Sequence, residues 1–303
     1  MAAWLSGTGS EMKRAFIRLV LLAIGITAGA WTHGTAVIAS YVGPGNIKSG
    51  ALAWGGLRCY SNAYSGNVAD IYAPADVSHT LLTCSAGGTI NETIQALATT
   101  CAVSCTVKTL YDQSGGTNCS GAPCTWVQAT EANRPNLILN ITGNGRSGMR
   151  FGGGAQNLAS PSISLAQPWT ISAALGKRTL HGGNFDSYLV SSTAAGLLGN
   201  ASANTVIVYG GSTGATAAVT DNAWHSIQAV FNTTASSAYV DTTTTSSLSA
   251  GTASMAGPLN VGKFGSVALS GDIFEVGLWA GTFSGPEQIA MGANQHGSNG
   301  YSF

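Results

Sequence analysis

The sequence predicts an all-β protein, an antiparallel β-sandwich of the concanavalin A-like jelly-roll type with short peripheral helices. Charged residues make up only 8% of the chain, against roughly 25% in an average soluble domain. Gly, Ser, Thr, Ala and Asn take their place, and long apolar runs do not. In the second half, short runs alternate between apolar and polar residues and are separated by Gly, Asn and Ser, as in strands joined by turns. We expect one such domain over residues 40–303.

The first 39 residues carry the features of an export signal. Lys13, Arg14 and Arg18 precede an apolar run at 19–26, and small residues of the kind found at cleavage sites follow. The run is shorter than the roughly 20 residues that a membrane-spanning helix needs. We expect residues 1–39 to be a signal peptide, with an uncleaved N-terminal anchor as the alternative. The mature protein should then have no membrane span and be secreted, periplasmic or on the cell surface.

The cysteines predict three disulfides. All six lie in one segment, and their even number fits an exported protein in an oxidising compartment. Two pairs are close enough in sequence to close short loops, which leaves one longer-range pair, although six cysteines allow other connectivities. Zinc is the competing interpretation, but no Cys-x-x-Cys occurs, so we expect neither a metal nor a cofactor. The expected pairs are Cys101 with Cys105, Cys119 with Cys124, and Cys59 with Cys84.

Strands are expected wherever alternation is clear. In one run, His225, Ile227, Ala229 and Phe231 share a face. One face of each strand should be buried, as is usual in antiparallel sheets. The expected strands are Trp169–Leu175, Thr205–Tyr209, Trp224–Phe231, Ala238–Asp241 and Ile273–Trp279.

Two short helices are also expected. Asn91 would cap one over residues 92–98. Ser284 and Glu287 form a capping box around Pro286 and would start a second helix that ends near Ala293. The formal net charge is +0 and basic residues do not cluster, so nucleic acid is not an expected partner.

One segment carries a family resemblance. Residues 106–115 read Thr-Val-Lys-Thr-Leu-Tyr-Asp-Gln-Ser-Gly, and this resembles a signature of the α-L-arabinofuranosidase B catalytic domain. Residues 57–66, the Cys101/Cys105 pair and Arg134-Pro135 resemble the same family, most clearly over residues 50–154. Later strands are similar in a more general way to concanavalin A-like lectin and glucanase domains, a fold that the family shares.

The resemblance implies a retaining glycoside hydrolase that removes terminal α-L-arabinofuranosyl residues from polysaccharide. Retention needs two carboxyl groups about 5 Å apart, one as nucleophile and one as acid/base. The family's nucleophile strand should correspond to residues 205–211 and its acid/base to residues 263–266, and neither segment contains a carboxylate. The alternative is therefore a catalytically inactive, lectin-like protein that binds glycans or serves in cell-surface or virion adhesion. A purely structural surface protein is a third hypothesis.

The remaining carboxylates give the candidate catalytic residues. Glu275 and Asp272 lie on one strand, where a spacing of three predicts opposite faces, and Glu275 would share its face with Ile273. Asp186, in a Gly-rich segment, and Trp126, beside the Cys119/Cys124 loop, are the candidate substrate-binding residues, because a Trp ring can stack on a sugar. Asp112 of the signature is expected to have a structural role in a tight turn.

Overall fold

The protein is represented by a computed structural model that describes residues 40–302 except 92–93, 102–103, 144, 178–184, 192–194, 201–204, 212, 221 and 299. Residues Tyr41–Phe303 form one compact unit. The predicted signal segment 1–39 lies outside the described residues. In the part of the chain that is described, no helix has the length and apolar character needed to cross a membrane.

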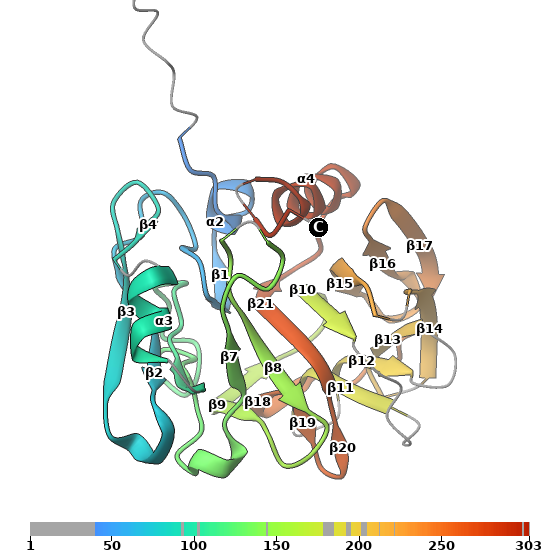
Figure 1. Ribbon diagram of the computed structural model, residues 1–303. Helices are drawn as coiled ribbons and strands as arrows, with labels where there is room; N and C mark the ends of the chain where they lie inside the picture. Colours follow the sequence, from blue (N-terminus) through green and yellow to red (C-terminus); the bar gives the residue numbers. More distant parts are fainter. Residues whose placement is uncertain are drawn as a thin grey trace, which may run out of the picture. The chain divides into compact units, whose positions relative to one another are not determined.

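The fold is an antiparallel β-sandwich, which confirms the predicted fold class (Figure 1). In the first layer, β21 (Ser270–Ala280) pairs with β10 along one edge, while its other edge is shared by β8 and by β1 (Ala51–Gly56). The hydrogen-bonded order of this layer is β4 (Thr89–Ile90), β3 (His79–Ser85), β2 (Gly66–Tyr72), β5 (Cys105–Leu110), β7 (Asn136–Ile138), β8 (Gly148–Gly152), β21, β10 (Trp169–Lys177), β15 (Trp224–Phe231), β16 (Ser236–Val240) and β17 (Thr243–Leu248).

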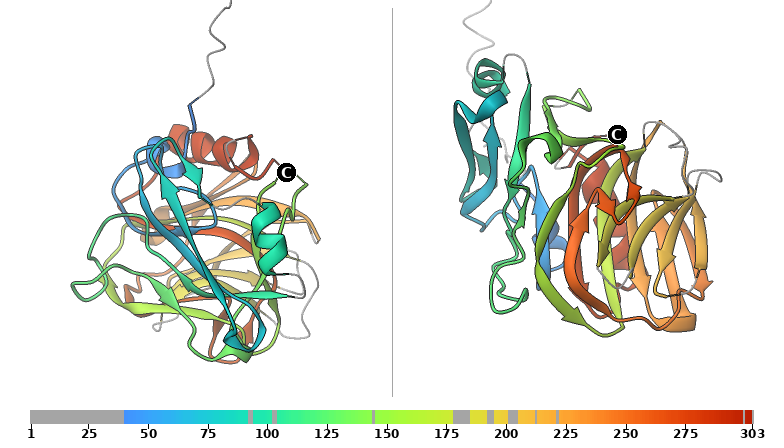
Figure 2. Two further views of the ribbon diagram at one scale, coloured as in Figure 1. Left: turned by 60° about the vertical axis from the view of Figure 1, so that its left-hand side comes forward. Right: turned by 90° about the horizontal axis from the view of Figure 1, so that it is seen from below.

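The second layer is joined to the first through the short strand β6, which pairs with both β5 and β9. Its order is β6 (Trp126–Val127), β9 (Leu158–Leu165), β18 (Met255–Val261), β11 (Phe185–Ser191), β12 (Gly196–Asn200), β13 (Thr205–Tyr209) and β14 (Thr213–Ala218). In the right-hand view of Figure 2, the blue and teal strands β2 and β3 stand to one side of the later, orange and yellow strands.

Short elements complete the unit. A separate hairpin, β19 (Lys263–Phe264) with β20 (Val267–Ala268), leaves the end of β18. The α-helices are α2 (Pro44–Ile47), α3 (Ile94–Thr100) and α4 (Gly285–His296), and the 3₁₀ turns are η1 (Pro74–Asp76), η2 (Glu131–Asn133) and η3 (Thr233–Ala235).

The main core lies between the two layers. Alternate residues of β10 and β15, such as Ile171 and Ile227, meet residues of the second layer such as Leu197, Val208 and Leu259, and all of these are buried. The predicted strands are confirmed, and the bounds of β13 and β15 are those expected from the sequence. The helices are confirmed as α3 and α4, each ending two or three residues later than expected.

The outer face of the middle strands of the first layer, β10, β15 and β21, is buried as well, which corrects the expectation of one buried face for these strands. Helix α4 covers it, next to α2 in Figure 1. Ser226 and Gln228 of β15, which the alternation placed outward, donate to Gln295 Oε1 of α4 at 2.6 and 2.8 Å. Polar residues on both elements are thus buried against each other and hydrogen-bonded, as buried polar groups generally are.

Strand β21 contains an irregularity that the sequence did not reveal. Its register with β10 shifts after Ile273, so that Leu175 pairs with Ile273 and Ala174 with Glu275. Both Ile273 and Val276 therefore belong to the main core, although strict alternation would put them on opposite faces. The prediction that Ile273 and Glu275 share a face was wrong for this reason.

All three expected disulfides are present. Cys59–Cys84 links residues 25 apart, and Cys101–Cys105 and Cys119–Cys124 close short loops. Asp112 is structural as predicted, because its carboxylate accepts the backbone N–H groups of Trp54, Ser114 and Cys124 at 2.8 to 3.0 Å.

Candidate functional site

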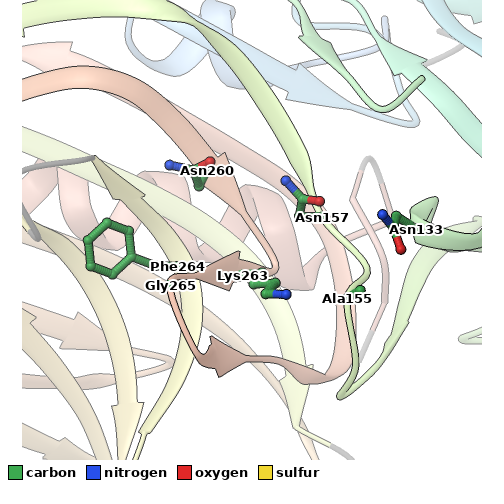
Figure 3. A pocket seen from close by; sticks show the side chains of 7 residues that line it. All are labelled: Asn133, Ala155, Asn157, Asn260, Lys263, Phe264 and Gly265. Carbon is green, nitrogen blue, oxygen red and sulfur yellow. The ribbon is translucent and has the colours of Figure 1, made fainter. Parts of the chain in front are cut away.

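A polar pocket of about 360 Å³ lies where the β19–β20 hairpin leaves β18. The segment just before β9 and the turn η2 form its other wall. Figure 3 shows Asn133 and Asn157 on one side of Lys263 and the Phe264 ring on the other, with Asn260 between the Phe264 ring and Asn157. The lining residues are Asn133, Ala155, Asn157, Asn260, Lys263, Phe264 and Gly265.

Two glycines hold the hairpin in place. Gly262 has φ +86° at the end of β18, and a Cβ atom there would lie 2.2 Å from the Phe151 ring, so a side chain has neither the backbone conformation nor the space. The Gly262 carbonyl accepts the N–H of Leu269 at 2.8 Å, which closes the hairpin base. Gly265 has φ +59° in the two-residue turn. These glycines thus allow the backbone turns that place Lys263 and Phe264 at the pocket.

The asparagines present amide groups to the pocket. Asn157 Oδ1 accepts from Gln128 Nε2 at 2.6 Å, and Asn260 Nδ2 donates to the Pro258 carbonyl at 3.3 Å. These contacts orient both amides. Among the described residues, Asn157 Nδ2 and Asn260 Oδ1 make no hydrogen bond, so one donor and one acceptor are available to a ligand.

The pocket can hold a polyhydroxylated ligand, because amides both donate to and accept from hydroxyl groups. The half-buried Phe264 adds an apolar surface next to these groups. No carboxylate is among the residues that line the pocket, within the described part of the chain. The arrangement therefore suits binding, and acid/base chemistry would need groups from elsewhere.

Glu275 is fully buried in an ion pair. Arg58 Nε and Nη2 donate to its two oxygens at 2.5 and 2.9 Å, and Gln295 Nε2 donates at 2.8 Å. Burial works against a charge on Arg58, but the adjacent carboxylate outweighs it and raises the pKa of Arg58 above its usual value. Burial, and then the charge of Glu275, raise the pKa of Tyr301, which stays neutral and donates to Glu275 at 3.1 Å. Four donors thus converge on one carboxylate.

Asp272 lies on the same strand in a second ion pair. Arg150 Nε and Nη2 donate to its oxygens at 2.8 and 3.2 Å, and its side chain is 2% exposed. Asp272 precedes Ile273 and Glu275 precedes Val276, both of which face the core, so the two carboxylates lie on the same outer face. This corrects the expectation of opposite faces. Each is bound to its own arginine, and their catalytic role stays a prediction.

The two candidate substrate-binding residues have different outcomes. Trp126 is 0% exposed and packs in the main core, so the expectation that its ring faces a ligand was wrong. The loop before Trp126 is closed by a disulfide, as predicted. Trp126 itself lies on β6, which joins the two layers, and its ring therefore packs into the core. Asp186 has its backbone in β11, opposite Gly199, and its side chain lies outside the described residues.

A histidine–aspartate cluster was missed because its members are far apart in sequence. Asp241 has φ +55° in the turn after β16 and accepts from His225 Nδ1 at 2.7 Å and from His296 Nε2 of α4 at 2.9 Å. Burial opposes charge on His225, but its bonds to Asp241 and the Thr220 carbonyl outweigh this and raise its pKa. Burial also opposes charge on Asp241, which for a carboxyl group raises the pKa. The hydrogen bonds from the two histidines outweigh this effect, so the pKa of Asp241 is well below its usual range. The cluster fastens the end of α4 to the first layer, beside a hollow of about 310 Å³.

The sequence matched neither a family model nor a curated protein. Among solved structures, the chain is similar to a mutant of a GH54 α-L-arabinofuranosidase soaked with 4-nitrophenyl α-L-arabinofuranoside, with 15% identity and a TM-score of 0.61. It is also similar to an arabinofuranosidase complexed with arabinofuranosyl-α-1,2-xylobiose, with 15% identity and a TM-score of 0.59. Each match covers 85% of this chain and 66% or 65% of the other, just under two thirds of its length. The arabinofuranosidase-like fold is therefore shared.

Proposed function

We propose that the protein is an exported glycan-binding protein built on an arabinofuranosidase-like sandwich. The observation that carries this proposal is the pocket in which Asn157 and Asn260 offer oriented amide groups beside Lys263 and Phe264. Oriented hydrogen-bonding groups next to an aromatic ring match a sugar, which has hydroxyl groups and an apolar C–H face. The similar arabinofuranosidase structures with bound arabinosides support a carbohydrate as the ligand class.

Export is part of the proposal. Three disulfides and no free cysteine among the described residues suit an oxidising compartment outside the cytosol. The basic and apolar pattern within residues 1–39 supports a secretory signal. The partner would be a polysaccharide or another glycan at or beyond the cell surface.

Retaining hydrolysis of terminal α-L-arabinofuranosyl residues is the second candidate. The similarity in fold to GH54 arabinofuranosidases favours it. Of the described carboxylates, Glu275 and Asp272 share the outer face of β21, where catalysis would require both to leave their arginine partners. A glycan would then have to replace a buried ion pair, which is costly because it leaves a charge uncompensated.

A glycan array, followed by titration calorimetry with the best-binding glycan, tests the first proposal. We expect the wild-type protein to bind and Asn157→Ala and Asn260→Ala each to weaken binding about tenfold, as expected for lost hydrogen bonds to a ligand. Asn67→Ala, an exposed asparagine of β2, is the matched control and should bind as the wild type does. Equal binding by all four proteins would contradict the proposed pocket.

Turnover of a chromogenic α-L-arabinofuranoside separates the two candidates. Binding without turnover supports a lectin-like protein. Turnover that Glu275→Gln or Asp272→Asn abolishes, in protein that is still folded by circular dichroism, supports the hydrolase. The absence of both binding and turnover would favour the hypothesis of a purely structural protein.

A further inference from the structure

The pocket contains one cation without a counter-charge. Lys263 is half-buried, and within the described residues its ammonium group has no carboxylate within ion-pair distance. The lining residues described around it are neutral. Its backbone pairs with Ala268 in the β19–β20 hairpin, and its side chain lines the pocket.

Two charged residues, Arg134 and Glu131, lie next to the pocket-lining Asn133, and each has a partner that does not line the pocket. Arg134, next to Asn133, forms a two-pronged ion pair with Asp76, with Nη2 and Oδ2 3.0 Å apart. Glu131, on the same turn, accepts the backbone N–H of Ala75 at 2.6 Å. Among the described residues that line the pocket itself, Lys263 is therefore the one that carries a charge.

The pocket offers two kinds of group to a ligand, oriented amides and one ammonium group. The amides of Asn157 and Asn260 pair with hydroxyl groups, whereas an ammonium group pairs best with an anionic oxygen, because charge-assisted hydrogen bonds are roughly twice as strong as neutral ones. A neutral arabinoside would leave the Lys263 charge partly desolvated without compensation. A sugar with its own carboxylate would pair with both the amides and the ammonium group.

We propose that the pocket selects acidic glycans, with Lys263 binding the carboxylate of a hexuronate residue while Asn157 and Asn260 bind its hydroxyl groups. This inference rests on the proposed function, since it names the substrate class of the same pocket. It differs from the arabinoside class suggested by the similar structures, because an arabinofuranosyl residue has no carboxylate.

Titration calorimetry on the full chain tests the inference with two matched pairs of trisaccharides. Trigalacturonate and α-1,4-galactotriose, and the uronate form of cellotriose and cellotriose itself, have the same rings and linkages and differ only in the carboxylate at C6. The proteins are the wild type, Lys263→Gln, Lys263→Arg and the control Lys108→Gln. Lys108 is on β5, and its ammonium group lies over the ring of Tyr72 on β2.

The wild type should bind the acidic member of at least one pair roughly five- to tenfold tighter than its neutral partner, and added salt should reduce this preference. Lys263→Gln should abolish the preference, while Lys263→Arg and Lys108→Gln should keep it. Equal affinity for both members, or a preference that survives in Lys263→Gln, would overturn the inference. Binding of neutral glycans alone would overturn it and leave the proposed function intact, whereas the absence of all glycan binding would overturn both.

Discussion

Replacing Glu275 distinguishes a structural carboxylate from a catalytic one. Its side chain is fully buried and accepts four hydrogen bonds, two of them from Arg58. Glu275→Ala would leave the Arg58 charge buried and uncompensated, and breaking a buried pair in this way costs about 3–5 kcal/mol. For a unit of this size, the melting temperature should fall by on the order of 10 °C.

Urea denaturation followed by tryptophan fluorescence measures this cost. Glu287→Ala is the matched control, because Glu287 on α4 also pairs with a cation, Lys48, but both side chains are about one third exposed. Exposed pairs contribute roughly 0–1 kcal/mol, and loss of the Glu287 contact to the Ser284 N–H adds about as much. A cost for Glu275→Ala no larger than that for Glu287→Ala would refute the structural role.

Four further predictions concern pH dependence, backbone conformation and a disulfide. Because the folded-state pKa of His225 is raised, its contribution to stability should be full below about pH 6.5 and be lost as pH rises through the raised value, so His225→Gln should flatten the change in urea midpoint between pH 6 and 9. The lowered pKa of Asp241 has the opposite sign, so acid titration of Asp241→Asn should show less loss of stability below about pH 4 than the wild type does. Gly262→Ala should lower the free energy of unfolding by about 2 kcal/mol and weaken glycan binding, measured by calorimetry, since its φ is +86° and it has no space for Cβ; an unchanged protein would contradict the hairpin geometry. Loss of the disulfide between Cys59 and Cys84, by changing both residues to Ser, should cost about 3 kcal/mol in urea denaturation because it closes a loop of 25 residues.

Local patterns were enough to predict much of the fold. The alternation in Trp224–Phe231 predicted β15 with its bounds, and Ser284-Gly-Pro-Glu predicted the start of α4. The disulfides were predicted from the number and spacing of the cysteines. In each case the feature was predicted from a few consecutive residues or from the number of cysteines.

The predictions that were wrong concern features that depend on contacts between residues far apart in the sequence. The shift in β21 leaves no mark in its own sequence, because it is produced by pairing with β10, and it moved Asp272 and Glu275 to one face. The second buried face of β15 depends on α4, which is distant in sequence. The pocket itself combines Asn133, Asn157 and residues 260–265, whose meeting depends on the path of η2, β9 and β18. Single asparagines in a chain rich in such residues give no signal by themselves.

A crystal structure of the protein with the tightest-binding glycan tests the central claim most directly. The account predicts a sugar in the pocket beside Lys263, with hydroxyl groups within hydrogen-bond distance of Asn157 Nδ2 and Asn260 Oδ1. A sugar bound at Glu275 and Asp272 instead, with the ion pairs to Arg58 and Arg150 opened, would contradict it.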